Sequence, residues 1–144
     1  FWAASNWAKW VDMHRDDPEA IAQLSRATAL MQRVIEIDDT FYYGGAHMYF
    51  GVYYGSRAPM LGGNFDKSRQ HFDRAREITG SKLLIPDLLQ AQYLARQQQD
   101  RDDFHQRLTN IINAPDDLMP ELGLQNQIAK RKAALLLEKE SEWF

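Results

Sequence analysis

The amino-acid sequence predicts an all-α protein of stacked helix–turn–helix pairs, closed by a capping helix at the carboxy terminus. Nearly every segment spaces its apolar residues three and four apart, and no segment shows the sustained alternation of a strand. Residues that start and stop helices recur along the chain. A triplet of apolar or small positions also repeats in three of the predicted helices. These observations favour a single domain over residues 1–144 with about seven helices.

Local signals place the helices in order along the chain. Asp17 is a capping residue and Pro18 suits the first turn of the helix that follows. Asn64 caps a later helix that ends at Gly80, and Pro86 lies in the first turn of another, where early amides lack partners. The predicted helices span residues 2–13, 17–37, 41–54, 65–79, 83–98, 101–113 and 121–138.

The repeated triplet indicates the architecture. Its three copies are Ala27, Met31 and Val34; Ser68, Phe72 and Ala75; and Phe104, Leu108 and Ile111. The first two copies are 41 residues apart and the last two are 36 apart, with the excess falling in the loop at residues 57–63. Helix–turn–helix units with a period of about 34 residues are typical of tetratricopeptide arrays. The sequence therefore predicts a tetratricopeptide-like helical repeat.

Residues 41–64 are the most distinctive segment, with seven aromatic side chains and six glycines. Each glycine inside a helix costs roughly 1 kcal/mol relative to alanine. We interpret the glycines as positions where a neighbouring helix approaches closely, with the aromatic rings filling the space beside them. Phe50 and Gly51 followed by Tyr54 match the large–Gly–x–x–Tyr spacing of a first repeat helix.

Composition excludes several classes of function. Cysteine is absent, which rules out disulfide scaffolds, thiolate metal sites and cysteine nucleophiles. The net charge of −3 and the pI near 5.8 give no attraction to nucleic acid or to an anionic membrane surface. No apolar run approaches the ~20 residues of a transmembrane helix. We therefore expect no nucleic-acid partner and no transmembrane segment in this chain.

No motif indicates catalysis, a cofactor or a metal. The sequence lacks HExxH, G-x-S-x-G, nucleotide-binding glycine loops and EF-hand patterns, so we expect no catalytic residues, no cofactor and no metal site. The histidines lie on separate helices. His47 is either a buried, hydrogen-bonded residue or part of a pocket, whereas His71 and His105 are predicted to lie at the surface.

The aromatic helix and the loop after it form the candidate binding site. Its predicted members are Tyr43, His47, Tyr53, Tyr54, Arg57, Met60 and Leu61. On the inner surface of a helical repeat these side chains would bind a small amphipathic or carboxylate ligand, or a partner protein. The alternative is that the tyrosines only fill the gaps that glycine leaves in the core.

Short patterns in a fixed order cover most of the chain. They are Trp2-Ala3-Ala4 with Trp7; Gly44-Gly45-Ala46-His47 with Gly51; Tyr54 with Gly62-Gly63-Asn64; Phe72 with Ala75; Asp100-Arg101 with Phe104 and Leu108; and Leu124, Asn126 and Ile128 through Ala133. With these patterns the chain resembles the T-component family of the tripartite ATP-independent periplasmic (TRAP) transporters.

The resemblance implies a non-enzymatic, periplasmic accessory protein with a tetratricopeptide-like fold. It further implies association with the solute-binding protein of the transporter and assembly into a trimer. We also expect the chain to receive a small organic solute. Such proteins are commonly lipid-anchored through an upstream cysteine, so this chain is expected to be the carboxy-terminal part of a longer protein. Two alternatives stay open: a generic tetratricopeptide adaptor that binds a peptide in its concave groove, and a helical enzyme with His47 and a tyrosine as acid–base pair.

Overall fold

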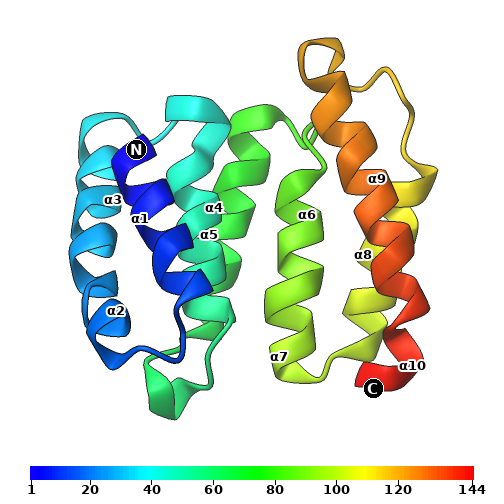
Figure 1. Ribbon diagram of the computed structural model, residues 1–144. Helices are drawn as coiled ribbons and strands as arrows, with labels where there is room; N and C mark the ends of the chain where they lie inside the picture. Colours follow the sequence, from blue (N-terminus) through cyan, green and yellow to red (C-terminus); the bar gives the residue numbers. More distant parts are fainter.

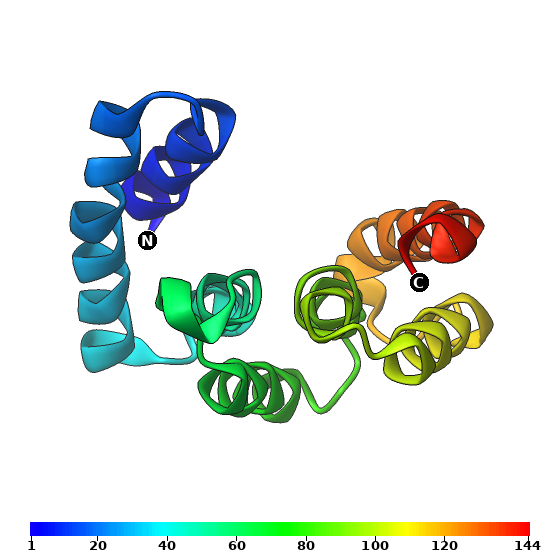
Figure 2. The same ribbon diagram turned by 90° about the horizontal axis from the view of Figure 1, so that it is seen from below.

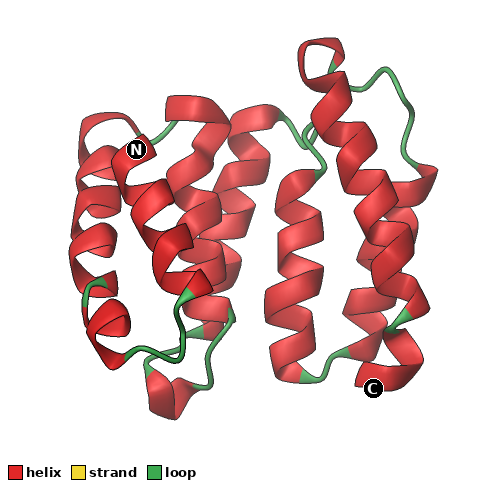
Figure 3. Ribbon diagram, in the orientation of Figure 1, coloured by secondary structure: helices red, strands yellow, loops and turns green.

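The computed structural model describes residues 1–144, which form helices joined by short connections without any strand (Figure 3). The α-helices are α1 (Trp2–Met13), α2 (Pro18–Ala22), α3 (Leu24–Asp38), α4 (Phe41–Gly55), α5 (Phe65–Thr79), α6 (Ile85–Leu89), α7 (Arg96–Gln98), α8 (Arg101–Asn113), α9 (Gly123–Glu138) and α10 (Glu140–Trp143). Two 3₁₀ turns, η1 (Pro59–Leu61) and η3 (Pro120–Leu122), and a π-helical segment, η2 (Gln90–Ala95), complete the chain.

The helices stack side by side in an arc (Figure 1). Viewed along most of the helix axes, α1, α4, the α6–η2–α7 rod and α9 line the inner side of the arc, whereas α3, α5 and α8 lie outside them (Figure 2). Neighbours in sequence pack as pairs: α1 with α3, α4 with α5, and the α6–η2–α7 rod with α8. The prediction of an all-α, repeat-like fold is confirmed.

The repeated triplets lie on the outer helices of these pairs. Met31 on α3, Phe72 on α5 and Leu108 on α8 are each fully buried, at 0% exposure. The remaining positions of the triplets are buried too, except Val34, which is half-buried. Each outer helix therefore directs an equivalent stripe of side chains against its inner partner.

Two glycines of α4 set its distance from α5. A methyl group added at Gly51 would lie 2.6 Å from the ring of Phe72, and one added at Gly55 would lie 2.5 Å from Oγ of Ser68. The Ser68 hydroxyl also donates a 2.6 Å hydrogen bond to the carbonyl oxygen of Gly51. The predicted close approach of a neighbouring helix is thus confirmed at both glycines.

The start of α4 differs from the regular helix predicted for residues 41–54. Tyr42, Tyr43 and Gly44 have φ values of 49°, 58° and 75°, which make a short left-handed turn. A left-handed conformation costs roughly 1–2 kcal/mol for each non-glycine residue. Aromatic and apolar packing offsets this cost, because the Tyr42 ring contacts Trp2 at 4.6 Å between centroids and Tyr43 packs on a cluster formed by Leu83, Met119 and Leu122.

The helix predicted for residues 17–37 is also interrupted. Its start is correct, since the Asp17 side chain accepts a hydrogen bond from the Glu19 amide and Pro18 occupies the first turn. The chain bends at Gln23, between α2 and α3. There the indole nitrogen of Trp7 donates a 2.9 Å hydrogen bond to the Gln23 side chain, which ties the bend to α1.

The last three predicted helices are found at the expected positions, but two of them differ from the prediction in helix type or in starting residue. The helix predicted for residues 83–98 is continuous from Ile85 to Gln98, yet its middle, η2, is π-helical. The helix at residues 101–113 matches α8. The final helix begins two residues late because residues 120–122 form the 3₁₀ turn η3, and it is followed by the short α10.

Candidate binding groove

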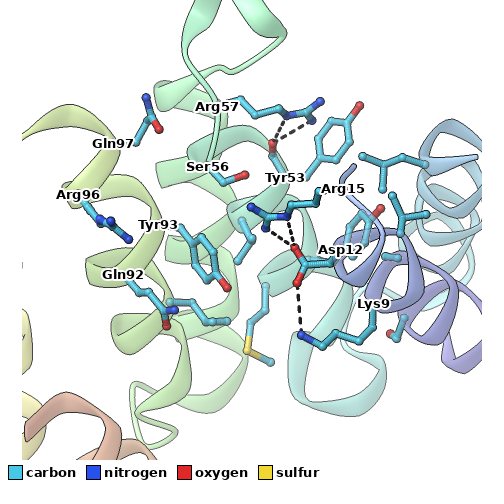
Figure 4. A pocket seen from close by; sticks show the side chains of 18 of the residues that line it. Lys9, Asp12, Arg15, Tyr53, Ser56, Arg57, Gln92, Tyr93, Arg96 and Gln97 are labelled. Atoms are coloured by element: carbon cyan, nitrogen blue, oxygen red, sulfur yellow. Dashed lines mark hydrogen bonds and ion pairs between the residues drawn. The ribbon is translucent and has the colours of Figure 1, made fainter. Parts of the chain in front are cut away.

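The inner side of the arc contains a hollow of about 1030 Å³, which we call the groove (Figure 4). Side chains from α1, α4 and the η2–α7 part of the rod form its walls, with contributions from Ile21 and Leu24. The groove therefore lies where three consecutive inner helices face a common space, as expected for the concave surface of a helical repeat.

One wall of the groove is aromatic. Tyr49 and Tyr53, one turn apart on α4, stack with ring centroids 6.1 Å apart. The hydroxyl groups of Tyr49 and Thr28 are hydrogen-bonded at 2.9 Å, and burial raises the pKa of Tyr49, so this phenol stays protonated at neutral pH. Tyr93 on η2 faces the groove from the other side (Figure 4). The walls thus offer flat apolar faces with hydroxyl groups at their edges.

At the end of α1, two cations share one carboxylate. Lys9 donates to Asp12 at 3.3 Å, and Arg15 Nε donates to the same side chain at 2.7 Å. Partial burial alone would raise the pKa of Asp12, but the hydrogen bonds from Arg15 and Lys9 outweigh it and lower that pKa. Asp12 is therefore ionised at neutral pH and neutralises one of its two neighbours.

Two further arginines of the groove have no carboxylate partner. Arg57 donates to the carbonyl oxygen of Tyr53 at 3.2 Å and 3.0 Å, and its guanidinium carbon lies 3.9 Å from the centroid of the Tyr53 ring. The guanidinium of Arg96 lies 3.7 Å from the ring centroid of Trp143 on α10. Aromatic faces hold both cations in place without neutralising them.

The groove is consequently positive in a protein that is negative overall. Four cationic side chains and one carboxylate line it, a formal charge of +3, whereas the whole chain carries −3. A concave surface lined by one sign of charge raises the local concentration of ligands of the opposite sign. The groove thus combines aromatic walls with an excess of positive charge.

The π-helical segment forms part of the groove wall. Gln92 and Tyr93 belong to η2, and both line the groove. π-helical turns are rare and occur frequently at functional sites, because the wider turn re-aims the side chains that follow it. The position of η2 at the groove, and not on an outer helix, is consistent with a functional role for this surface.

The structure brings only two of the seven predicted site residues into the groove, Tyr53 and Arg57. Tyr54 lies on another side of α4, where its ring stacks on those of Phe50 and His71 at 6.0 Å and 5.9 Å. Tyr43 belongs to the left-handed turn. Met60 and Leu61, at the tip of the η1 loop, are 90% and 69% exposed and do not line the groove.

The two histidines of α4 and α5 lie together, outside the groove. His47 is buried and its Nδ1 lies 2.9 Å from Nδ1 of His71, while its Nε2 lies 3.2 Å from Asp39. The prediction of a surface position is therefore wrong for His71, which is half-buried among aromatic rings, whereas His105 is exposed. Both ring nitrogens of His47 are engaged, one by Asp39 and the other by His71.

Most groove residues were missed by the sequence-based prediction. The missed residues include Lys9 and Asp12 on α1, Arg15 just after α1, and Tyr93 and Arg96 on the third inner helix. The signal that would have found them is the repeat itself, because the first helix of each pair lines the concave side of such arrays. The prediction instead concentrated on the aromatic segment and its loop.

No three histidine, aspartate or glutamate side chains come together in a way that could hold a metal ion. None of the helices combines the length and the apolar character that crossing a bilayer requires.

The fold and the groove define an all-α, repeat-like helical protein with a concave, positively charged face. A family model described as TRAP transporter T-component matches residues 1–144, the whole chain. The chain therefore belongs to the TRAP transporter T-component family, which is a transporter component and not a known enzyme family. A search of curated proteins found no match.

Proposed function

We propose that this protein is a periplasmic accessory component of a TRAP transporter whose groove binds a small amphipathic solute with a carboxylate group. The aromatic faces of Tyr53 and Tyr93 would cover the apolar part of the solute, and Arg57 and Arg96 would pair with its carboxylate. Arginine suits this role because its planar fork donates two hydrogen bonds to a carboxylate.

The observation that carries the proposal is the charge of the groove. Arg57 and Arg96 are held by aromatic rings and have no carboxylate partner, although the chain as a whole is acidic. The other two cations, Lys9 and Arg15, share the carboxylate of Asp12, which neutralises one of them. An anionic ligand would supply the missing partner for the two arginines.

Calorimetry with matched ligands tests the proposal. Benzoate and hexanoate carry the expected carboxylate, whereas benzamide and hexanamide have the same apolar parts without the charge. We expect both acids to bind at least about tenfold more tightly than their amides, a difference of about 1.4 kcal/mol. Equal affinity of acid and amide, or no binding of either, would contradict the carboxylate site.

Variants locate the site. Arg57→Ala should weaken the binding of benzoate, while Arg33→Ala, which removes an exposed arginine from the outer helix α3, should leave it unchanged. A protein that ignores all four small ligands but captures acidic peptides from an array, with loss of capture on Arg57→Ala, would support the peptide-binding adaptor instead.

The transporter role has its own test. We propose that the chain associates with the solute-binding protein of its TRAP system, assembles as a trimer, and is anchored by lipid through an upstream cysteine. Sedimentation of the purified chain, alone and with that solute-binding protein, measures both associations. A monomer that does not co-sediment with the solute-binding protein would contradict this part of the proposal, while leaving the groove to be judged by calorimetry.

A further inference from the structure

A chain of four polar side chains joins α4 to α5 on the side away from the groove. Arg74 Nε donates to Asp39 at 2.8 Å, and the same carboxylate oxygen lies 3.2 Å from His47 Nε2. His47 Nδ1 in turn lies 2.9 Å from His71 Nδ1. We call Arg74, Asp39, His47 and His71 the latch.

With both histidines neutral, the donors and acceptors of the latch fit one arrangement of protons. The hydrogen bond from Arg74 keeps the pKa of Asp39 below its ordinary range, so Asp39 is ionised and can only accept. His47 Nε2 must therefore carry the hydrogen that it donates to Asp39. In neutral His47 the other nitrogen, Nδ1, is then an acceptor, and His71 Nδ1 donates to it. The pair can take up one proton and keep both hydrogen bonds, because only one of the facing Nδ1 atoms then needs to carry a hydrogen. A second proton would place N–H donors on both Nδ1 atoms, 2.9 Å apart, and break the bond between the rings.

The latch spans the left-handed turn at the start of α4. Asp39 precedes this turn and His47 follows it. Their hydrogen bond therefore connects the two ends of the segment that contains Tyr42, Tyr43 and Gly44. A strained backbone segment persists only where the surrounding contacts hold it. The latch supplies polar contacts of this kind and attaches the segment to α5 through His71 and Arg74.

We propose that these four residues form an acid-sensitive latch, which holds the left-handed turn and the first turns of α4 against α5 while one of the two facing Nδ1 atoms is free to accept, and releases them when both carry a hydrogen. The same helix supplies Tyr49 and Tyr53 to the groove, so release would loosen the groove wall. Regulation by pH is thereby built into the packing of one helix pair.

The surroundings of His71 oppose its protonation in the closed latch. Phe50 and Tyr54 stack on its ring from α4, Lys67 lies on the same helix α5, and His47 faces it. The charges nearest the pair are Asp39 from the α3–α4 junction and Arg74, which also binds Glu77. Burial, followed by the influence of His47 and of Lys67, lowers the pKa of His71 to about 4. An opened latch exposes this histidine, which then takes up a proton near its ordinary pKa.

Proton linkage sets the size of the expected effect. The pKa of His71 is about 6.5 in the open form and about 4 in the closed form. Between these two values, each pH unit of acidification raises the equilibrium constant for opening by up to about tenfold. Because His71 is only half-buried, we expect a total of about tenfold between about pH 7 and about pH 5.

Amide hydrogen exchange of residues 45–53 measures this opening. After correction for the intrinsic exchange rate, protection in the wild-type protein should fall about tenfold between about pH 7 and about pH 5. His71→Gln keeps a donor for His47 Nδ1 but cannot be protonated, so its protection should change less than about twofold over the same range. His105→Gln, which alters an exposed histidine on α8, should behave as the wild type does.

Protection that is independent of pH in the wild-type protein, or equally pH-dependent in His71→Gln, would overturn the latch. If His71→Gln does not fold, the imidazole titration of wild-type His71 decides: a pKa near 4 supports the latch, and a value near the ordinary 6.5 overturns it. The latch requires no ligand in the groove, so this result is separate from the calorimetric test of the proposed function.

Discussion

Arg57 lies against Tyr53 in two ways at once, with its guanidinium 3.9 Å from the ring centroid and its nitrogens hydrogen-bonded to the Tyr53 carbonyl oxygen. The carbonyl belongs to the last turn of α4, where cations interact favourably with the helix dipole. Arg57 therefore closes the end of α4 and presents its charge to the groove.

Adjacent tyrosines should behave differently on substitution. Tyr53→Ala removes part of the groove wall and the support of Arg57, so the affinity for benzoate should fall about tenfold. Tyr54→Ala removes a ring that packs on Phe50 and His71, so it should lower the free energy of unfolding by about 1–3 kcal/mol without a comparable loss of affinity. Calorimetry and urea denaturation of both variants make the comparison. A larger loss of affinity in Tyr54→Ala than in Tyr53→Ala would contradict the groove site, because it would place benzoate on the side of α4 that faces His71.

The distance between α4 and α5 can be tested at Gly51. Gly51→Ala would place a methyl group 2.6 Å from the ring of Phe72, which is fully buried. We expect a loss of about 1–3 kcal/mol in the free energy of unfolding. The matched control is Gly123→Ala in α9, where the added methyl group meets nothing within 4 Å and better helix propensity should stabilise the protein by about 0.5–1 kcal/mol. Similar effects at both positions would contradict the close packing of α4 on α5.

Asn126 holds α9 to the loop before α6. Its side chain is buried at 1% exposure, accepts a 2.9 Å hydrogen bond from the Leu84 amide and donates one of 2.9 Å to the Lys82 carbonyl. Asn126→Ala leaves both backbone groups without this partner, so the free energy of unfolding should fall by about 1–3 kcal/mol. Asn113→Ala, at an exposed position, should change it by less than about 0.5 kcal/mol. Thermal unfolding that does not separate the two variants would exclude this role for Asn126.

The stability of the protein should decrease in mild acid because of His71. Its pKa in the folded protein is about 4, below the ordinary value of about 6.5, so the unfolded chain binds the additional proton. The stabilisation is complete above about pH 6.5 and is lost as the pH falls toward 4. After allowance for solvent screening of this half-buried ring, the loss should be about 1–2 kcal/mol.

Urea denaturation between about pH 7.5 and about pH 4.5 measures this loss. In His71→Gln the free energy of unfolding should depend less steeply on pH. The carboxylates of Asp39 and Glu140 have lowered pKa values, because of their bonds to Arg74 and to His105, so their contribution is lost only at lower pH. A free energy of unfolding that is constant over this range, or a slope unchanged in His71→Gln, would contradict the assignment of the effect to His71.

The sequence predicted the paired helices because their signals are local and repeated. Asn64 accepts a hydrogen bond from the Lys67 amide and Gly80 adopts φ of 59°, as expected for the start and end of α5. The left-handed turn was missed because Tyr42 and Tyr43 are held there by side chains distant in sequence, including Trp2 and Met119. The π-helical segment carries no glycine or proline that would mark it.

The site was predicted in part, and the missing part has a geometric reason. A run of tyrosines does not say which of them face the same way, and successive residues of a helix are rotated by about 100°. Tyr53 therefore lines the groove while Tyr54 faces His71. Arg57 was predicted because it stands next to the tyrosines in the sequence, and in the structure it lies against Tyr53 and lines the groove. The α1 residues were missed because their place in the groove depends on how the pairs stack.

NMR chemical-shift mapping with benzoate tests the central claim, that the groove on the inner side of the arc is a binding site for an amphipathic anion. We predict saturable shifts of residues in α1, α4 and the η2–α7 segment, centred on Tyr53, Arg57, Tyr93 and Arg96. Benzamide should produce much weaker shifts at the same positions. Saturable shifts centred on the outer helices α3, α5 and α8, or no saturable shift at all, would contradict the account.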